Sequence, residues 1–136
     1  MRHQKKQLKL NRERDHRAAL IRNMVTSIIL FEKIKTTTAR AKAVVPVVED
    51  LISKAKNLEA REAIRQINEV VLDDNACKKL LEVLKDRYKT REGGYTRVTK
   101  LGNRSGDAAI VVQIQLIPGR QHTHILQTSR KQKNGL

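Results

Sequence analysis

Basic side chains are concentrated at the two ends of this chain, and this distribution limits the folds open to it. Residues 1–42 carry twelve basic and three acidic residues, a net charge of +9. Residues 88–136 carry nine basic and two acidic residues, a net charge of +7. Residues 43–87, in contrast, carry eight basic and nine acidic residues, a net charge of −1. Ends with this charge repel each other in a compact state unless a polyanion neutralises them. We therefore expect a neutral middle that supports the fold and basic ends that meet a polyanion.

Length and composition exclude several classes of protein. The chain has 136 residues, enough for one domain with one core. Its longest apolar run, Ala43–Val48, is six residues long, whereas a membrane-spanning helix needs about 18. The first 17 residues carry seven basic groups and no apolar signal segment. A single cysteine, Cys77, cannot form an internal disulfide. We expect a cytoplasmic protein with no membrane partner and no small-molecule substrate.

Apolar residues at three- and four-residue spacing predict four helices in the first two thirds of the chain. The predicted ranges are 15–31, 38–56, 60–72 and 75–88. Pro46 lies inside the second range and lacks a backbone N–H, so we expect it to kink the helix or to begin a new first turn. Residues 73–75 offer capping oxygens to the last helix. Cys77 shares the phase of Leu80 and Leu84, which favours a buried apolar side chain over a nucleophile.

The last third of the chain has the composition of β-strands. The predicted strands cover residues 34–38, 95–101 and 109–117. The turn formers at 102–107 predict a hairpin loop between the last two strands. The predicted fold class is therefore α+β, with three to four helices packed with a small, mainly antiparallel sheet of about three strands. This single domain spans residues 15–117, between a basic arm at 1–14 and a basic C-terminal tail at 118–136.

No arrangement of residues in the sequence indicates catalysis. The segment GNRSG at 102–106 lacks the Gly-Lys-Ser/Thr ending of a phosphate-binding P-loop. The four histidines have no carboxylate pair or cysteine at metal-ligand spacing. Nine of the 14 acidic residues fall in the neutral middle, where mixed-charge helix surfaces explain them. We therefore expect no enzymatic activity, no cofactor and no metal.

Nucleic acid is the expected polyanion, and structured RNA is the favoured form. The aromatic residues are Phe31, Tyr88 and Tyr95, whereas single-strand binders stack several bases on aromatic rings. The cysteine count excludes zinc fingers, and no basic region is followed by heptads. The remaining mode is recognition of the shape and phosphates of a folded or duplex nucleic acid. Structured RNA fits this mode best, and DNA packaging is the second choice. Residues 1–14 are expected to become ordered along phosphates, the alternative being a disordered solubilising tail.

Several separated motifs resemble those of one protein family. They are MRH at 1–3, KLN at 9–11, HR at 16–17, RNM at 22–24, IKTT at 34–37, AK at 41–42, GGYTR at 93–97, KLG at 100–102 and GDA at 106–108. In this order, over residues 1–117, the chain resembles the bacterial large-subunit ribosomal protein seventeen family. It departs from the family at Ala109-Ile110, where many members carry Ala-Pro, and it matches loosely over 57–88. The tail at 118–136 has no counterpart.

The resemblance implies a structural constituent of the large ribosomal subunit without enzymatic activity. Such a protein binds and stabilises large-subunit (23S) rRNA near the rim of the peptide exit tunnel. Its partners are this rRNA and neighbouring large-subunit proteins, and it is present as a single copy per ribosome in the cytoplasm. The rRNA-binding positions carried over are Arg2, His3, Lys5, Lys6, Lys9, Arg12, Arg14, His16, Arg17, Arg22, Arg97, Lys100 and Arg104, and Lys35 and Arg91 complete the predicted set.

Two other functions stay open on the sequence alone. A free nucleoid-type DNA-binding protein would bind duplex DNA at least as well as rRNA. An RNA-processing enzyme would need a carboxylate or histidine near the basic surface, for which Asp107 and His16 are the candidates. Loss of that group would abolish activity without weakening binding.

Overall fold

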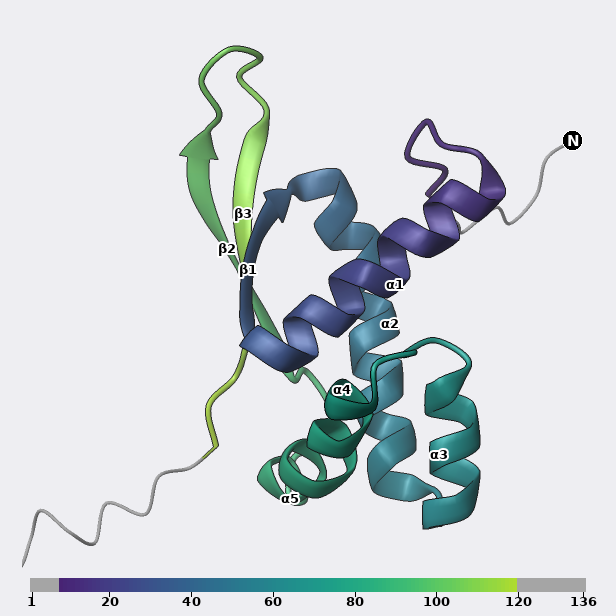
Figure 1. Ribbon diagram of the computed structural model, residues 1–136. Coiled ribbons are helices and arrows are strands. Elements are labelled where there is room, and N and C mark those ends of the chain that lie inside the picture. The colour runs from purple at the N-terminus through teal and green to yellow at the C-terminus, as the bar shows by residue number, and fades with distance from the viewer. Residues whose placement is uncertain (1–7, 120–136) are drawn as a thin grey trace, which may run out of the picture.

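The computed structural model describes residues 8–119, in which a group of helices lies on one side of a three-stranded sheet (Figure 1). The helices are α1 (Arg14–Phe31), α2 (Thr38–Asn57), α3 (Ala60–Asn68), α4 (Asp74–Lys79), the π-helical turn η1 (Leu80–Leu84) and α5 (Lys85–Arg87). The strands are β1 (Lys33–Thr37), β2 (Thr96–Asn103) and β3 (Ile110–Leu116). The predicted α+β fold class is confirmed. Residues 1–7 of the predicted arm and 120–136 of the predicted tail lie outside the described residues.

The sheet is antiparallel, and its strand order β1-β3-β2 places the last strand in the centre. Ile114 of β3 pairs with Ile34 on one side and with Val98 on the other. The hairpin formed by β2 and β3 extends past β1 and projects from the rest of the molecule (Figure 1). A bulge between Lys100 and Gly102 interrupts the pairing there. Gly102 has a φ of 138°, a conformation that side chains disfavour, so glycine is needed at this position.

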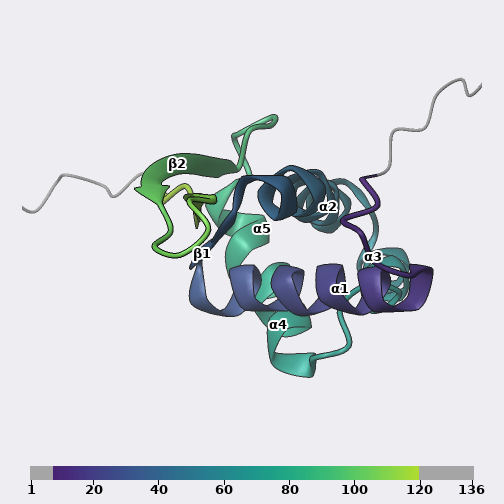
Figure 2. The same ribbon diagram turned by 90° about the horizontal axis from the view of Figure 1, so that it is seen from above.

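The core lies between the helices and one face of the sheet. Alternate residues of β3 are buried, because successive side chains of a strand point to opposite faces. The buried residues of β3 are Val112, Ile114 and Leu116, and those of α1 and α2 are Val25, Ile28, Ile29, Ala41, Val44, Val48, Leu51, Ile52 and Ala55. The helices therefore cover one face of the sheet, and its other face is open (Figures 1 and 2).

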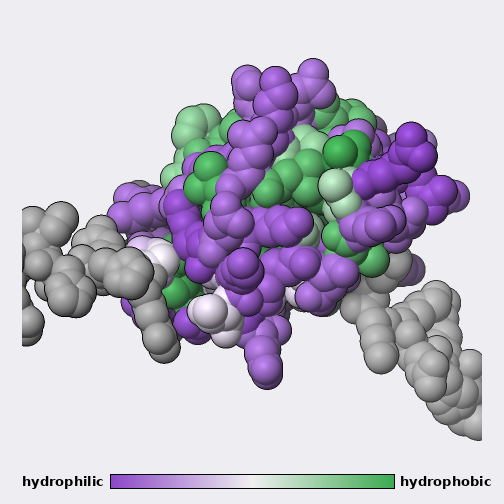
Figure 3. Space-filling model, turned by 90° about the horizontal axis from the view of Figure 1, so that it is seen from below, coloured by the Kyte–Doolittle hydropathy of each residue, from purple (hydrophilic) through white to green (hydrophobic). Residues whose placement is uncertain are grey.

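The predicted helices are present, but α3 is shorter than expected. It ends at Asn68, and the backbone N–H groups of Val70 and Val71 both donate to the carbonyl of Ile67. This turn directs Val71 into the core, where it is 1% exposed, and leaves Leu72 75% exposed. Leu72 is one of the apolar residues that remain at the surface, and Figure 3 shows such residues among hydrophilic side chains on the lower face of the molecule. Periodicity alone extended the helix too far because Val71 and Leu72 continue the apolar pattern.

Two further helical predictions can be compared with the structure. α2 continues through Pro46 as one helix, so no new first turn begins there. The predicted helix at 75–88 is a continuous helical segment over 74–87. Its N-cap is Asp73, whose Oδ1 accepts hydrogen bonds from the backbone N–H of Asn75 at 2.8 Å and of Ala76 at 3.1 Å. The π-helical turn inside this segment was not predicted, because π-helical turns are rare and have no distinct apolar period.

Candidate nucleic-acid interface

The open face of the sheet, meaning the side chains of its strands that point away from the helices, is basic and polar. Strand pairing aligns these side chains in transverse rows. The first two rows are Lys33–Gln115–Arg97 and Lys35–Gln113–Thr99. The three strands contain no acidic residue. Because neighbouring strands lie about 4.8 Å apart, the cations of the two edge strands flank the central glutamines closely enough for one phosphate backbone to contact both.

Four residues of this open face were missed by the sequence analysis. They are Lys33, Thr99, Gln113 and Gln115. Part of the signal was present in the sequence, because the two glutamines alternate with Ile114 and Leu116. The missing information was the strand order, since only the central position of β3 places its glutamines between the basic residues of β1 and β2.

The structure separates two predicted residues of β2. Arg97 lies on the open face, in register with Gln115. Lys100 is in register with Val112, whose side chain faces the helices, so Lys100 lies on the opposite face from Arg97. Both are nevertheless exposed, because the helices leave the edge strand β2 largely uncovered, as the half-exposed Val98 and Leu101 also show. The hairpin therefore presents cations from both of its faces.

The loop between β2 and β3 is held by an ion pair between Arg104 and Asp107. Nε and Nη2 of Arg104 donate to the two carboxylate oxygens. Asp107 Oδ1 also accepts from the backbone N–H of Ala109 at 3.2 Å. The guanidinium hydrogen bonds and this backbone donor lower the pKa of Asp107 to about 2. Asp107 therefore has a structural role in this loop, which weakens its candidacy as a proton-transferring residue of an RNA-processing enzyme.

Arg91 organises the loop before β2. Its Nε donates to the carbonyls of Gly93 at 3.1 Å and Gly94 at 3.0 Å. Gly94 has a φ of 61°. The buried Tyr95 donates its hydroxyl proton to the carbonyl of Arg91 at 3.2 Å, and Lys56 donates to the Tyr95 hydroxyl at 2.9 Å and to the same carbonyl. Gly93 and Gly94 are thus exposed in a fixed loop, and the buried Tyr95 anchors that loop just before β2.

A second basic surface lies at the start of α1. Its members are the predicted residues Lys9, Arg12, Arg14, His16 and Arg22, which are exposed, and Arg17, which is half-buried. Figure 1 shows the start of α1 and the hairpin on opposite sides of the molecule, so the structure does not bring the two groups together. The remaining predicted residues of the arm, Arg2, His3, Lys5 and Lys6, lie outside the described residues. In the part of the chain that the structure describes, Arg104 is the one member of the predicted set with a carboxylate ion pair.

Other sequence features lie apart from these surfaces. Cys77 is 8% exposed, and burial raises the pKa of its thiol, as expected for a packed rather than a reactive side chain. Over residues 8–119, no three His, Cys, Asp or Glu side chains come together as ligands for a metal ion. None of the helices described is both long and apolar enough to span a bilayer.

Comparison with known proteins identifies the family. The family described as "Ribosomal protein L17" matches residues 20–117, which include the last two thirds of α1 and the whole sheet. The large ribosomal subunit protein bL17 of Syntrophotalea carbinolica is 49% identical over 119 residues, covering 86% of this chain and 75% of that protein. The protein of the same name from Desulforudis audaxviator is 49% identical, and the match covers 76% of this chain and 91% of that protein. The protein of the same name from Petrotoga mobilis is 45% identical, and the match covers 87% of this chain and 98% of that protein. The chain belongs to the ribosomal protein L17 family.

Proposed function

We propose that this protein binds large-subunit rRNA through two separate basic surfaces on a rigid body. It is a structural constituent of the large ribosomal subunit and is not an enzyme, as its family membership and its relatives establish. The first surface, called the helix surface, consists of Lys9, Arg12, Arg14, His16, Arg17 and Arg22. The second, called the sheet surface, consists of Lys33, Lys35, Arg91, Arg97, Lys100 and Arg104 with the glutamines of β3. Arg2, His3, Lys5 and Lys6 extend the first surface in this proposal.

The acid-free open face of the sheet is the observation that carries the proposal. A solvated face of an antiparallel sheet usually mixes charges of both signs, as the helices of this protein do. Here the strands carry lysine, arginine, threonine and glutamine, whose side chains can all donate hydrogen bonds to phosphate oxygens. The cations of such a face repel one another, and binding a polyanion relieves that repulsion.

The separation of the two surfaces supports a bridging role. The helix surface and the sheet surface lie on opposite sides of one packed core (Figure 1). A body of this kind can contact two rRNA segments at once and hold them at a fixed distance, because the core does not deform. We place the contacts near the rim of the peptide exit tunnel, with one copy of the protein in each large subunit beside other large-subunit proteins.

Sedimentation of ribosomes tests the assignment to the particle. A cell lysate is separated on sucrose gradients at low and at moderately high salt, and the protein is quantified by mass spectrometry against other large-subunit proteins. We expect one copy for each large subunit at both salt concentrations. Recovery in light fractions, or with DNA that nuclease releases, would contradict the proposal and favour a nucleoid protein.

Crosslinking tests the proposed surfaces. Ribosomes are irradiated, and the peptides joined to rRNA are identified. We expect crosslinks from both basic surfaces, and we expect the rRNA partners to lie at the tunnel rim. Crosslinks confined to α3 and α4, whose surfaces carry charges of both signs, would contradict the assignment of the interface.

A further inference from the structure

A groove between α1 and α2 has a composition that phosphate binding alone does not require. It has a volume of about 420 Å³, and Leu8 is among the residues that line it. Three cations line it, Arg14 and Arg17 from α1 and Lys42 from α2. Figure 2 shows α1 and α2 side by side, with the segment that precedes α1 passing next to them.

The groove exists because small residues face each other where the helices meet. Ala18 of α1 and Ala43 of α2 both line it, and neither side chain is long enough to fill the space. The remaining lining is apolar and comes from Ile21, Pro46 and Val47. Among residues 8–119, no acidic side chain lines the groove. The result is an apolar recess with three cationic side chains around it.

Pro46 adds a hydrogen-bond acceptor beside the recess. Because proline has no N–H, the carbonyl of Lys42, four residues earlier in α2, loses its helical donor. Both residues line the groove. Lys42 and Pro46 are both exposed, so water can reach this carbonyl, and an N–H group of a ligand can take the place of that water.

We propose that this groove binds one unstacked nucleotide of large-subunit rRNA. The base occupies the apolar recess over Ala43, Pro46 and Val47, and the phosphates on its two sides contact Arg14, Arg17 and Lys42. An exocyclic amino group of adenine, cytosine or guanine supplies the donor for the Lys42 carbonyl. This inference rests on the proposed function, because it names one nucleotide-binding site within the helix surface.

The chemistry of the groove distinguishes an unstacked nucleotide from other occupants. Phosphates of a continuous duplex lie on the outside of the helix and need no apolar recess. An apolar side chain of a neighbouring protein would fill the recess but would leave three cations without partners. A nucleotide with its base turned out combines an apolar surface, hydrogen-bond donors and flanking anions in one ligand. It therefore uses all the groups that the groove presents.

A matched pair of substitutions tests the proposal. Ala18 and Ala19 are adjacent, exposed residues of α1, and only Ala18 lines the groove. Ala18→Leu fills the recess without changing charge, and Ala19→Leu makes the same change outside it. Leucine is a good helix former, so we expect both variants to fold with the melting temperature of the wild type. Binding of the full-length proteins to refolded large-subunit rRNA is measured by filter retention across a salt series.

We expect Ala18→Leu to weaken binding about tenfold, which is typical of losing one stacked or buried base. The slope of log affinity against log salt should stay unchanged, because no phosphate contact is lost. Ala19→Leu should bind as the wild type does. Chemical probing of the rRNA should show one nucleotide whose base reactivity changes on binding wild type and Ala19→Leu, and not on binding Ala18→Leu.

Three results would overturn the inference or the function beneath it. Equal binding by the two variants, with the same rRNA reactivities, would exclude the nucleotide site while leaving rRNA binding intact. Equal rRNA binding combined with weaker retention of Ala18→Leu in whole large subunits would assign the groove to a protein side chain instead. Failure of the wild type itself to bind large-subunit rRNA would contradict the proposed function and not the groove alone. If Ala18→Leu unfolds, Lys42→Gln is tested in its place. We expect that binding of Lys42→Gln no longer changes the reactivity of the nucleotide that the wild type protects.

Discussion

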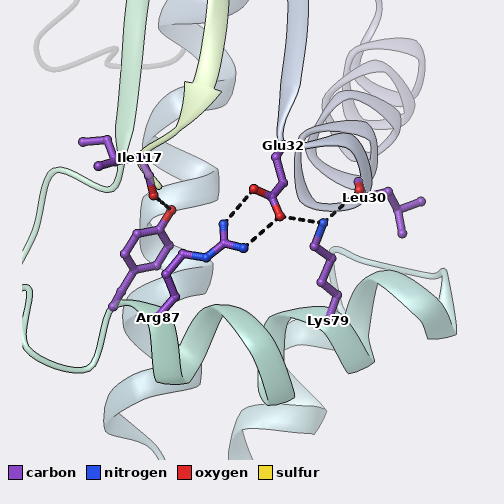
Figure 4. A network of polar contacts seen from close by, with 6 residues as sticks. Leu30, Glu32, Lys79, Arg87 and Ile117 are labelled. Carbon is purple, nitrogen blue, oxygen red and sulfur yellow. Dashed lines mark hydrogen bonds and ion pairs between the residues drawn. The ribbon is translucent and has the colours of Figure 1, made fainter. Parts of the chain in front are cut away.

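Glu32 and Arg87, which are 55 positions apart in the sequence, form a two-pronged ion pair that joins the end of α1 to α5 (Figure 4). Nη1 of Arg87 donates to Oε2 at 2.7 Å, and Nη2 donates to Oε1 at 3.0 Å. Lys79 contacts the same carboxylate at 2.9 Å and also donates to the carbonyl of Leu30. Glu32 has a φ of 61°, and its carbonyl accepts from the backbone N–H of Leu116. One residue thus fixes the corner from which β1 enters the sheet.

Replacing Glu32 should destabilise the fold. Glu32→Gln removes the charge that Arg87 and Lys79 share and leaves two half-buried cations close together. Removing one partner of a fully buried pair costs about 3–5 kcal/mol. Because the Glu32 side chain is 33% exposed, we expect a smaller loss, about 1–2 kcal/mol of unfolding free energy. Urea unfolding followed by circular dichroism measures it, with Glu69→Gln at an exposed site as the control. Equal stability of both variants would show that the network contributes nothing.

Stability should also fall at acidic pH for the same reason. The Arg87 hydrogen bonds, together with Lys79, lower the pKa of Glu32 from 4.5 to about 2. Between these values the unfolded chain binds more protons than the folded protein, so unfolding is favoured as the pH decreases. The contribution of Glu32 is therefore complete above about pH 4.5 and is lost as the pH falls through about 2. Asp107 titrates in the same range, so the difference between wild type and Glu32→Gln isolates Glu32. A difference that stays constant from pH 6 to pH 2 would contradict this account.

The cap of the helical segment 74–87 gives a third test. Asp73→Ala removes the acceptor for the N–H groups of Asn75 and Ala76, and we expect it to cost about 1 kcal/mol. Asp73→Asn keeps a capping oxygen and should retain most of the stability. Thermal unfolding of the two variants and the wild type makes the comparison. If Asp73→Asn lost as much as Asp73→Ala, charge rather than capping would be responsible.

Much of this fold could be predicted from the sequence because its local signals are strong. Apolar spacing located the helices, and Cys77 was placed correctly because it shares the phase of Leu80 and Leu84. The turn formers around Gly106 located the hairpin loop. These signals depend on residues close together in the chain, so no long-range pairing was needed to interpret them.

The parts that could not be predicted depend on residues that are distant in the sequence. Glu32 and Arg87 are each ordinary surface residues by pattern, and only the packing of α5 against the corner after α1 brings them together. Strand alternation predicts that Arg97 and Lys100 point to opposite faces of the sheet. Which of the two lies on the open face depends on which face the helices cover, and the sequence alone does not show this. The groove beside Lys42 depends on how α1 and α2 pack. Its alanines give no signal in the sequence.

The two basic surfaces give the last prediction, which concerns salt. If the protein contacts about six to ten phosphates, log affinity for large-subunit rRNA should fall against log salt with a slope of about −5 to −9. Lys35→Gln and Arg97→Gln each remove one cation from the open face of the sheet, so each should weaken binding and reduce the steepness of that slope by about 1. Lys78→Gln removes an equally exposed cation from α4, outside both surfaces, and should leave the slope unchanged. Filter binding of the four full-length proteins at several salt concentrations measures all the slopes. A flat response of the wild type would exclude the electrostatic account. An effect of Lys78→Gln as large as that of Arg97→Gln would show that net charge, rather than the open face of the sheet, determines the affinity.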